Sequence, residues 1–379
     1  MNMNYSVSQY VEPACGLVQG AKRTSFFQSL SRRGGRRRVA DMKQFLLILA
    51  VVMGQSVLAA DKKALNKEES AKVIERAIRE AVKKPEGRLT EEDYKKTVEL
   101  NLFDQEITDI SSLSRLTRLG KLNLMENRII DISSLANLKD LKKLNVGQNP
   151  LKDLSPLAGL VQLEELWTGN YGTKDRFNVP LNLIPLKGLV KLEKLQIVGS
   201  YIKDLSPVCE LPEITFLELA YSRIDDYQPL LKLKKLQGLQ LEGNVTAKDN
   251  LKIISELFEL NYLKLQGCYI DDLSPLSSLT KLKHLNLGSN RIKDLTPLED
   301  MADMRILDLH SNEVTDVRPL IRMRELEILK LGRNPITDFS PLTNLDKLRI
   351  LEVDKEKLVE SNLAEIKASN PKINIRGVN

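Results

Sequence analysis

Apolar and polar residues alternate along most of this chain in one recurring pattern, which is clearest at residues 282–298. Written generally, the unit reads LxxLxLxxNxIxDLSPLxxLxx. Units begin at residues 97, 119, 141, 163, 192, 214, 236, 260, 282, 304, 326 and 348. Nine of the eleven spacings are 22 residues and the other two are 29 and 24, so the chain is built from a repeated structural unit.

Each part of the unit predicts a local structure. The alternation in LxLxx places the leucines on one face of a short strand. The Asn at the ninth position, as at Asn127 and Asn290, can bond the backbone of a turn whose polar groups would otherwise be buried without partners. In the Asp-Leu-Ser-Pro stretch at 153–156, we expect the Ser to cap a short helical turn that starts with Pro. The row of Asp residues at the thirteenth position, from Asp109 to Asp338, is also expected to act as caps.

A single unit buries too little apolar surface to offset the entropy of ordering its backbone, so the units must stack. Stacking lets each strand pair with the next and buries both sides of each leucine layer. The predicted fold class is therefore α/β: a right-handed, curved solenoid with a parallel sheet on its concave face.

Both ends of such a stack need covering, and the sequence offers elements for this. Residues 66–84 have helical apolar spacing, with Asn66 and Glu69 placed as an N-cap and its partner, and Thr90 starts a shorter helix. A last strand at 348–353 and a helix at 362–368 close the other end. We assign 61–96 to a helical N-terminal cap, 97–347 to repeats 1–11 and 348–379 to the last strand and C-terminal cap, with no attached enzyme domain.

The N-terminal 60 residues differ from the rest in charge. They hold eight of the 57 Lys and Arg residues and two of the 51 Asp and Glu residues, which leaves 61–379 formally neutral. Lys43, an apolar run at 45–53 and a small-residue site at Ala59 predict a secretory signal peptide over 42–60. The apolar run is shorter than the roughly 20 residues of a spanning helix, so we expect no membrane span in the mature chain. Residues 1–41 are interpreted as a mis-assigned start or a leader extension.

The 22-residue unit, with its Asn followed by Ile-x-Asp-Leu-Ser-Pro-Leu, resembles the internalin-like subclass of bacterial leucine-rich repeat proteins over residues 97–358. This resemblance implies a leucine-rich repeat solenoid that binds a protein or surface ligand on its concave face. The chain lacks the wall-sorting motif and the following immunoglobulin-like region of Gram-positive internalins, so surface anchoring is not implied.

The concave face should carry the third, fifth and seventh residues of each unit, with the eighth at its margin. Its charged residues comprise nine acids and seven bases, which excludes a groove that tracks nucleic-acid phosphates. Exposed rings are favoured anchors in protein interfaces and in glycan sites. The opposing interpretation is that the rings only pack on one another across adjacent strands. The partner-binding residues that we predict, centred on repeats four to eight, are Phe103, Trp167, Tyr171, Phe177, Phe216, Tyr221, Tyr262, His284 and His310.

The fourth unit is seven residues longer than the standard unit, and its irregular part at 169–177 contains Tyr171 and Phe177. Such a bulge can carry contacts, or it can be a tolerated surface insertion. Trp167, the only tryptophan, lies at its base.

No metal, cofactor or catalytic site is predicted. His284 and His310 are separated by about 13 Å at ~3.3 Å per strand residue, too far to share a zinc ion, and we expect both to be solvated. Cys209 and Cys268 lie three units apart, about 14 Å at ~4.8 Å per strand, which exceeds disulfide reach, and both are predicted to be core residues. A carboxylate in every turn supplies too few oxygens for calcium, and no nucleophile or phosphate-loop motif is present.

The sequence thus predicts a secreted or periplasmic, monomeric binding scaffold for a protein ligand, without nucleic acid as a partner. Two alternatives stay open. One is binding of carbohydrate or cell-envelope material near Trp167 and Tyr262, and the less favoured one is an enzyme with an unrecognised site.

Overall fold

The computed structural model describes residues 63–169, 180–359 and 361–378. Residues 65–379 form one compact unit. The predicted leader and signal peptide, together with Tyr171 and Phe177, lie outside the described residues.

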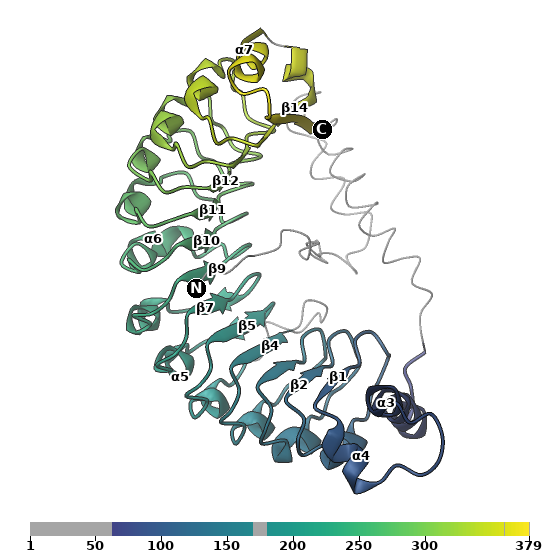
Figure 1. Ribbon diagram of the computed structural model, residues 1–379. Helices are drawn as coiled ribbons and strands as arrows, with labels where there is room; N and C mark the ends of the chain where they lie inside the picture. The colour runs from purple at the N-terminus through teal and green to yellow at the C-terminus, as the bar shows by residue number, and fades with distance from the viewer. Residues whose placement is uncertain (1–62, 170–179, 360, 379) are drawn as a thin grey trace, which may run out of the picture. The chain divides into compact units, whose positions relative to one another are not determined.

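Thirteen parallel strands form one continuous sheet in the described residues, and they line the inner side of a curved stack of repeats (Figure 1). Their order in the sheet follows the chain. The strands are β1 Glu99–Asn101, β2 Lys121–Asn123, β3 Lys143–Asn145, β4 Glu165–Gly169, β5 Lys194–Val198, β7 Phe216–Glu218, β9 Gly238–Gln240, β10 Tyr262–Lys264, β11 His284–Asn286, β12 Ile306–Asp308, β13 Ile328–Lys330, β14 Ile350–Asp354 and β15 Asn374–Val378.

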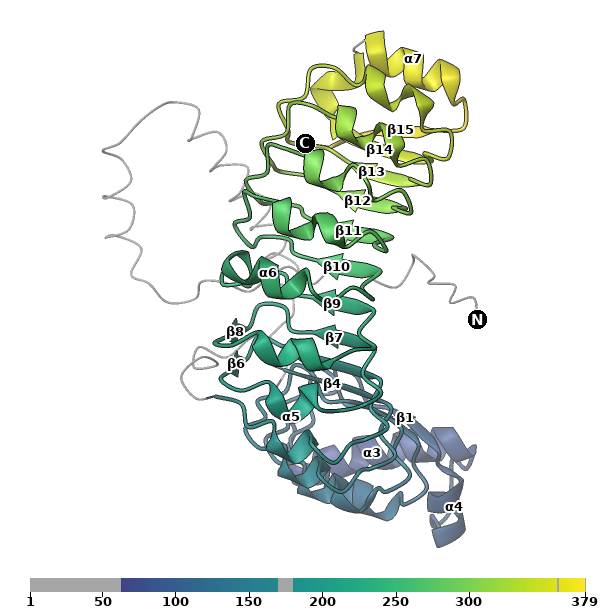
Figure 2. The same cartoon turned by 90° about the vertical axis from the view of Figure 1, so that its left-hand side faces the viewer.

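Short helices return the chain on the outer side, so each repeat is one strand and one helical turn (Figure 2). The helices of α type are α3 Lys67–Val82, α4 Glu91–Lys96, α5 Ser206–Cys209, α6 Leu251–Ile254 and α7 Ser361–Ser369. The 3₁₀ helices are η1 Ser111–Arg115, η2 Ser133–Asn137, η3 Ser155–Leu157, η4 Ile184–Leu186, η5 Gln228–Lys232, η6 Lys248–Asn250, η7 Ser274–Ser278, η8 Thr296–Leu298, η9 Arg318–Arg322, η10 Ser340–Asn344 and η11 Lys355–Val359.

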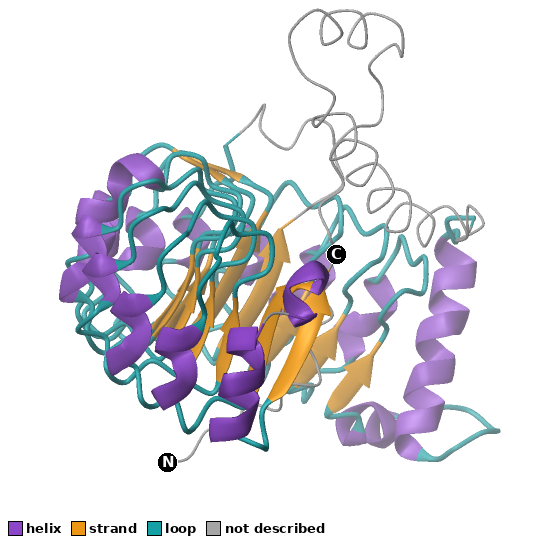
Figure 3. Ribbon diagram, turned by 90° about the horizontal axis from the view of Figure 1, so that it is seen from above, coloured by secondary structure: helices purple, strands orange, loops and turns teal. Residues whose placement is uncertain are grey.

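The strand register confirms the period of the repeat. Leu100 pairs with Leu122, which pairs with Leu144, so equivalent residues of successive units form straight rows across the sheet. These leucines are at most 4 % exposed and join one apolar cluster between the sheet and the helices. Figure 3 shows the two layers from above, with the strands on the inner side and the helices outside. The predicted α/β leucine-rich repeat solenoid is confirmed.

The ninth-position Asn residues act as predicted. The Asn127 side-chain oxygen accepts hydrogen bonds from the backbone N–H groups of Gln105 and Ile107, at 3.2 and 3.0 Å. Its amide nitrogen donates to the carbonyls of Leu102 and Leu124, at 2.8 and 2.9 Å. One buried amide thereby satisfies backbone groups of two neighbouring turns, which water cannot reach.

The prediction that Ser caps the helical turns is wrong, whereas the capping role of Asp is confirmed. The helix η3 begins at Ser155 itself, and Leu154 before it makes no side-chain cap. Asp153 instead accepts from the Ser155 backbone N–H at 2.8 Å and from the Ser155 hydroxyl at 2.6 Å. A carboxylate two residues upstream reaches the free N–H in an Asx turn, so the Ser oxygen is not needed there.

Both ends of the stack carry the predicted helices. Asn66 and Glu69 form a reciprocal capping box at the start of α3, and Ile74 and Ile78 of this helix are buried in the common core. At the other end, α7 is followed by β15, which pairs in parallel with β14. The sequence pattern did not reveal β15, because Asn374, Arg376 and Gly377 interrupt its apolar alternation.

The central repeats depart from this scheme. Ser200 and Ser222 stand at the Asn position, and the Ser222 hydroxyl accepts from the Ser200 N–H at 3.2 Å and donates to the Ile197 carbonyl at 3.2 Å. A hydroxyl has only one proton to donate, so it satisfies fewer groups than an amide. The backbones here pair directly in a second small sheet, formed by β6 Tyr201–Ile202 and β8 Arg223–Ile224.

Candidate binding surface

The third residues of the repeats form a row across the concave side of the sheet, which we call row three. Its members pair in register from β1 to β14. The N-terminal part of the row is charged, and the C-terminal part is apolar or aromatic. Row three reads Glu99, Lys121, Lys143, Glu165, Lys194, Phe216, Gly238, Tyr262, His284, Ile306, Ile328 and Ile350.

The charged part of row three is held by ion pairs between neighbouring strands. Glu165 lies between two lysines, with its Oε1 3.0 Å from Lys143 Nζ and 3.1 Å from Lys194 Nζ. Glu99 and Lys121 pair at 3.2 Å, and both side chains are more than half exposed. Exposed pairs of this kind contribute little free energy, so they mainly set the polarity of the surface.

The apolar part of row three starts with three rings in contact. The ring centroids of Phe216 and Tyr262 are 5.8 Å apart, although β9 lies between their strands. Those of Tyr262 and His284 are 4.4 Å apart. The rings do pack on one another, as the opposing interpretation held, yet each remains half-buried and not covered. Ile306, Ile328 and Ile350 extend this half-buried row to β14.

Two glycines of the repeat at 236 make room for rings of the preceding repeat. A Cβ on Gly238 would lie 2.4 Å from Cδ2 of Phe216, so the Phe216 ring can lean across β9 only because this side chain is absent. A Cβ on Gly243 would lie 2.4 Å from Cδ1 of Tyr221. Tyr221 itself has φ +52°, a backbone conformation that costs an aromatic residue free energy. The two rings thus frame the concave side of β9.

Between these rings lie buried charged groups. Glu242 is 9 % exposed, and its Oε1 is 3.4 Å from Lys264 Nζ. Glu218 accepts from Gln240 Nε2 at 2.9 Å. Burial raises the pKa of Glu242 to about 7 and also raises the pKa of Glu218, while the charge of Lys264 lowers both. Burial likewise raises the pKa of Tyr262 to about 12.

The expectation that His284 is solvated is wrong. Its ring packs on Tyr262, and burial, followed by the charge of Lys264, lowers its pKa to about 4, so it is neutral near pH 7. The His310 ring is partly exposed, and its Nδ1 lies 2.6 Å from Asp308 Oδ1. In the described part of the chain, no group of three His, Cys, Asp or Glu residues could hold a metal ion.

The other predicted partner-binding residues lie outside this group. Phe103 follows β1 and is 43 % exposed, with β2 to β5 separating its strand from β7. Trp167 lies in β4 and pairs with Asn145 and Gln196 in the row of fifth residues. The structure therefore brings together Phe216, Tyr262 and His284 from the predicted set. Tyr221 lies on the repeat of Phe216, and His310 lies on the repeat that follows His284.

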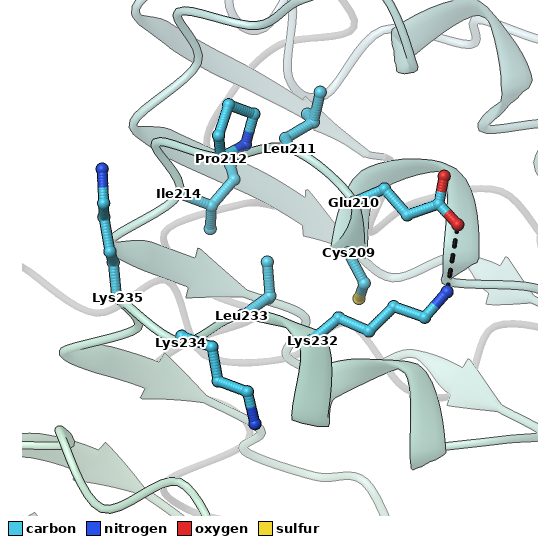
Figure 4. A pocket seen from close by; sticks show the side chains of 9 residues that line it. All are labelled: Cys209, Glu210, Leu211, Pro212, Ile214, Lys232, Leu233, Lys234 and Lys235. Atoms are coloured by element: carbon cyan, nitrogen blue, oxygen red, sulfur yellow. Dashed lines mark hydrogen bonds and ion pairs between the residues drawn. The ribbon is translucent and has the colours of Figure 1, made fainter.

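A hollow lies away from row three, between α5 and η5 (Figure 4). Cys209 lines it, and Lys232 Nζ reaches across to Glu210 Oε1 at 3.0 Å. Burial raises the pKa of Cys209 to about 12, which keeps the thiol protonated. Cys209 and Cys268 are both free and buried, so their prediction as core residues is confirmed.

The parallel sheet, the Asn bonds and the outer 3₁₀ turns define a leucine-rich repeat solenoid. A family model described as leucine-rich repeats in two copies matches residues 259–300. An internalin from Listeria monocytogenes superposes with a TM-score of 0.64 at 25 % identity, covering 81 % of this chain and 95 % of that one. An internalin C2 from the same species is 26 % identical and covers 74 % of this chain and 92 % of that one, with a TM-score of 0.31.

The chain therefore has a leucine-rich repeat fold that is similar to that of internalins. No curated protein matches it. No helix in the described ranges is long and apolar enough to cross a membrane. Leucine-rich repeat scaffolds of this class typically mediate protein interactions.

Sequence reasoning did not single out Gly238, Gly243 and Glu242 among the concave residues. A signal for the glycines was present, because Gly occupies positions where the preceding repeat has an aromatic residue. The burial of Glu242 had no signal in the sequence, since the pattern places the seventh residue on the concave face.

Proposed function

We propose that this protein is an exported scaffold that binds a protein partner on the concave face of its central and C-terminal repeats. The observation that carries the proposal is the half-buried apolar part of row three, from Phe216 to Ile350. It runs over six strand spacings from β7 to β14, about 29 Å at ~4.8 Å per strand. An apolar row beside polar neighbours is typical of a protein interface core with its rim.

The partner contacts would centre on Phe216, Tyr262 and His284. Packing between these rings fixes their rotamers before binding, which lowers the entropy cost of an interface. Tyr221 and His310 would lie at its margin. Trp167 lies in β4 and Phe103 follows β1, so neither is on the strands of this group. They and the lengthened fourth repeat are proposed as a separate, outlying part of the binding surface.

The test is capture from the organism's envelope and culture fluid with the full chain. Tyr262→Ala and Ile328→Ala should lose the captured protein, while Lys121→Ala, in the charged part of row three, should retain it. Melting temperatures of all three variants should show that the fold persists. Equal capture by all variants would contradict a concave-face site, and capture of purified envelope glycan in place of protein would favour the carbohydrate alternative.

Export is the second part of the proposal, and the signal-peptide pattern at 42–60 supports it. Mass spectrometry of the native N-terminus should find a chain that begins at Ala60, after cleavage at Ala59, or at Asp61, after cleavage at Ala60. Recovery of peptides from 1–41 in the protein from cells would contradict a start at Met42 and would favour a leader extension.

A further inference from the structure

The strand β9 stands out on the concave side, because its three residues are all buried. The rings of Phe216 and Tyr221 lie over Gly238 and Gly243, so the middle of the repeat at 236 is framed by rings. The buried side chains between them belong to Gln240 and Glu242. This arrangement places acidic groups, not apolar ones, at the centre of an aromatic surface.

The charges in this centre do not balance. The carboxylates of Glu218 and Glu242 both feel the same cation, Lys264. Lys264 Nζ lies 3.4 Å from Glu242 Oε1, beyond the roughly 2.7–2.9 Å of a strong charge-assisted hydrogen bond. The second oxygen of Glu242, Oε2, is buried and has no hydrogen-bond partner. A buried carboxylate oxygen without a partner is costly, and a further positive group or a proton would relieve that cost.

We propose that β7, β9 and β10 form a binding site for a single cationic side chain, of the arginine or lysine class, carried by the protein partner. The proposal rests on the concave-face function proposed above and specifies the partner's chemistry. Glu218 and Glu242 supply the negative charge, and Phe216, Tyr221 and Tyr262 supply ring faces and edges for the aliphatic stem and the cation. Binding requires the Glu242 side chain to turn its second oxygen toward the concave side.

A proton competes with the cation in this site. The groups that face Glu242 are Glu218 and Lys264, and Tyr262 lies within reach of the same charges. Because burial raises the pKa of Glu242 to about 7, its carboxyl is largely protonated at pH 5.5 and largely ionised at pH 8. The site should therefore take up a cation at pH 8 and release it as the pH falls.

The experiment is ligand-observed NMR with the full chain and N-acetyl-arginine amide, with the uncharged isostere N-acetyl-citrulline amide as the matched probe. At pH 8 we expect saturable millimolar binding of the arginine probe and none of the citrulline probe. Glu242→Gln should weaken binding by about tenfold or more. The control Glu213→Gln removes an exposed carboxylate, paired with Lys235 at 2.8 Å, and should leave binding unchanged.

Two further measurements keep the proposal testable if Glu242→Gln does not fold. Lys264→Gln removes the resident cation and should strengthen binding of the arginine probe. In the unmodified chain, binding should weaken at pH 5.5. Equal binding of both probes, equal affinity at pH 8 and 5.5, or unchanged affinity in a folded Glu242→Gln variant would overturn the proposal. Because the probes are small molecules, these outcomes are independent of partner capture, which tests the concave-face function itself.

Discussion

The central repeats, at 192–281, and the regular repeats, at 282–347, follow the same strand-and-turn plan but differ in the side chains at equivalent positions. The regular repeats carry an Asn at each ninth position, and Asn290, Asn312 and Asn334 bond the turns in the same way. In the central repeats the same position holds a Ser twice and a Cys once, with Asn244 between them.

The two groups of repeats also differ in the residues that they place on the concave side. The regular repeats present His284, Ile306 and Ile328 in row three, whereas the central repeats present Phe216 and Tyr262, with Glu218 and Glu242 nearby. Departures from a protein's own local rules are expected where function, not stability, sets the residue. The regular repeats therefore keep every Asn bond of the scaffold and extend its apolar row, whereas the central repeats give up some of these bonds and hold the larger rings and the acids of the concave side.

The largest expected effect is the difference in unfolding free energy between replacing an Asn and replacing a Ser at the ninth position of a repeat. Asn312→Ala removes bonds to the Ile292 N–H and to the carbonyls of Leu287 and Leu309, so we expect a loss of roughly 3–4 kcal/mol in unfolding free energy. Ser222→Ala should lose only about 1 kcal/mol, because its neighbouring backbones pair directly. Urea denaturation of both variants measures the difference. Equal losses would show that the Asn bonds stabilise the regular repeats no more than the Ser bonds stabilise the central repeats.

A smaller effect is the pH dependence of the unfolding free energy that comes from Glu242 and His284 on the concave side. Glu242 has a pKa raised from 4.5 to about 7, so the stability that it contributes is present below pH 4.5 and is lost as the pH rises through about 7. His284 has a pKa lowered from 6.5 to about 4, so its contribution is present above pH 6.5 and is lost as the pH falls through about 4. Each shift corresponds to roughly 3 kcal/mol, and the two oppose one another between pH 4.5 and 6.5.

Variants that remove only one of these groups should therefore show a pH dependence of the unfolding free energy that partly cancels in the unmodified chain. Relative to that chain, Glu242→Gln should gain stability as the pH rises from 5 to 8, and His284→Phe should gain stability as the pH falls from 6.5 to 4.5. Urea denaturation across this range measures both slopes, with Glu213→Gln as an exposed control. Parallel pH profiles for Glu242→Gln and the unmodified chain would show that Glu242 is not perturbed by burial.

A third prediction tests whether the ring positions depend on glycine. In Gly238→Ala the new Cβ would lie 2.4 Å from the Phe216 ring, so the ring must move, at a cost of about 1–2 kcal/mol. In the control Gly120→Ala the nearest atom is the Val98 carbonyl oxygen at 3.6 Å, an ordinary contact. We expect lower stability and weaker partner capture for Gly238→Ala only. Loss of stability without loss of capture would place the interface elsewhere on row three.

The regular features of this molecule were predictable from sequence, because the repeat ties each residue type to one position. Asn127 and Leu100 behave as their positions imply. Predictions failed where the outcome depends on a neighbour outside the unit. His284 packs half-buried against Tyr262 of the preceding repeat, and the Phe216 ring depends on the missing side chain of Gly238. Such pairs are set by side-chain volume across strands, which a pattern of apolar positions does not record.

The smallest expected effect lies in the charged part of row three. Glu99 and Lys121 pair at 3.2 Å with both side chains more than half exposed, so water screens their attraction. Replacing Glu99 with Gln should change the unfolding free energy by less than about 0.5 kcal/mol and should leave partner capture intact. A loss of capture in this variant, with an unchanged melting temperature, would extend the interface into the N-terminal repeats.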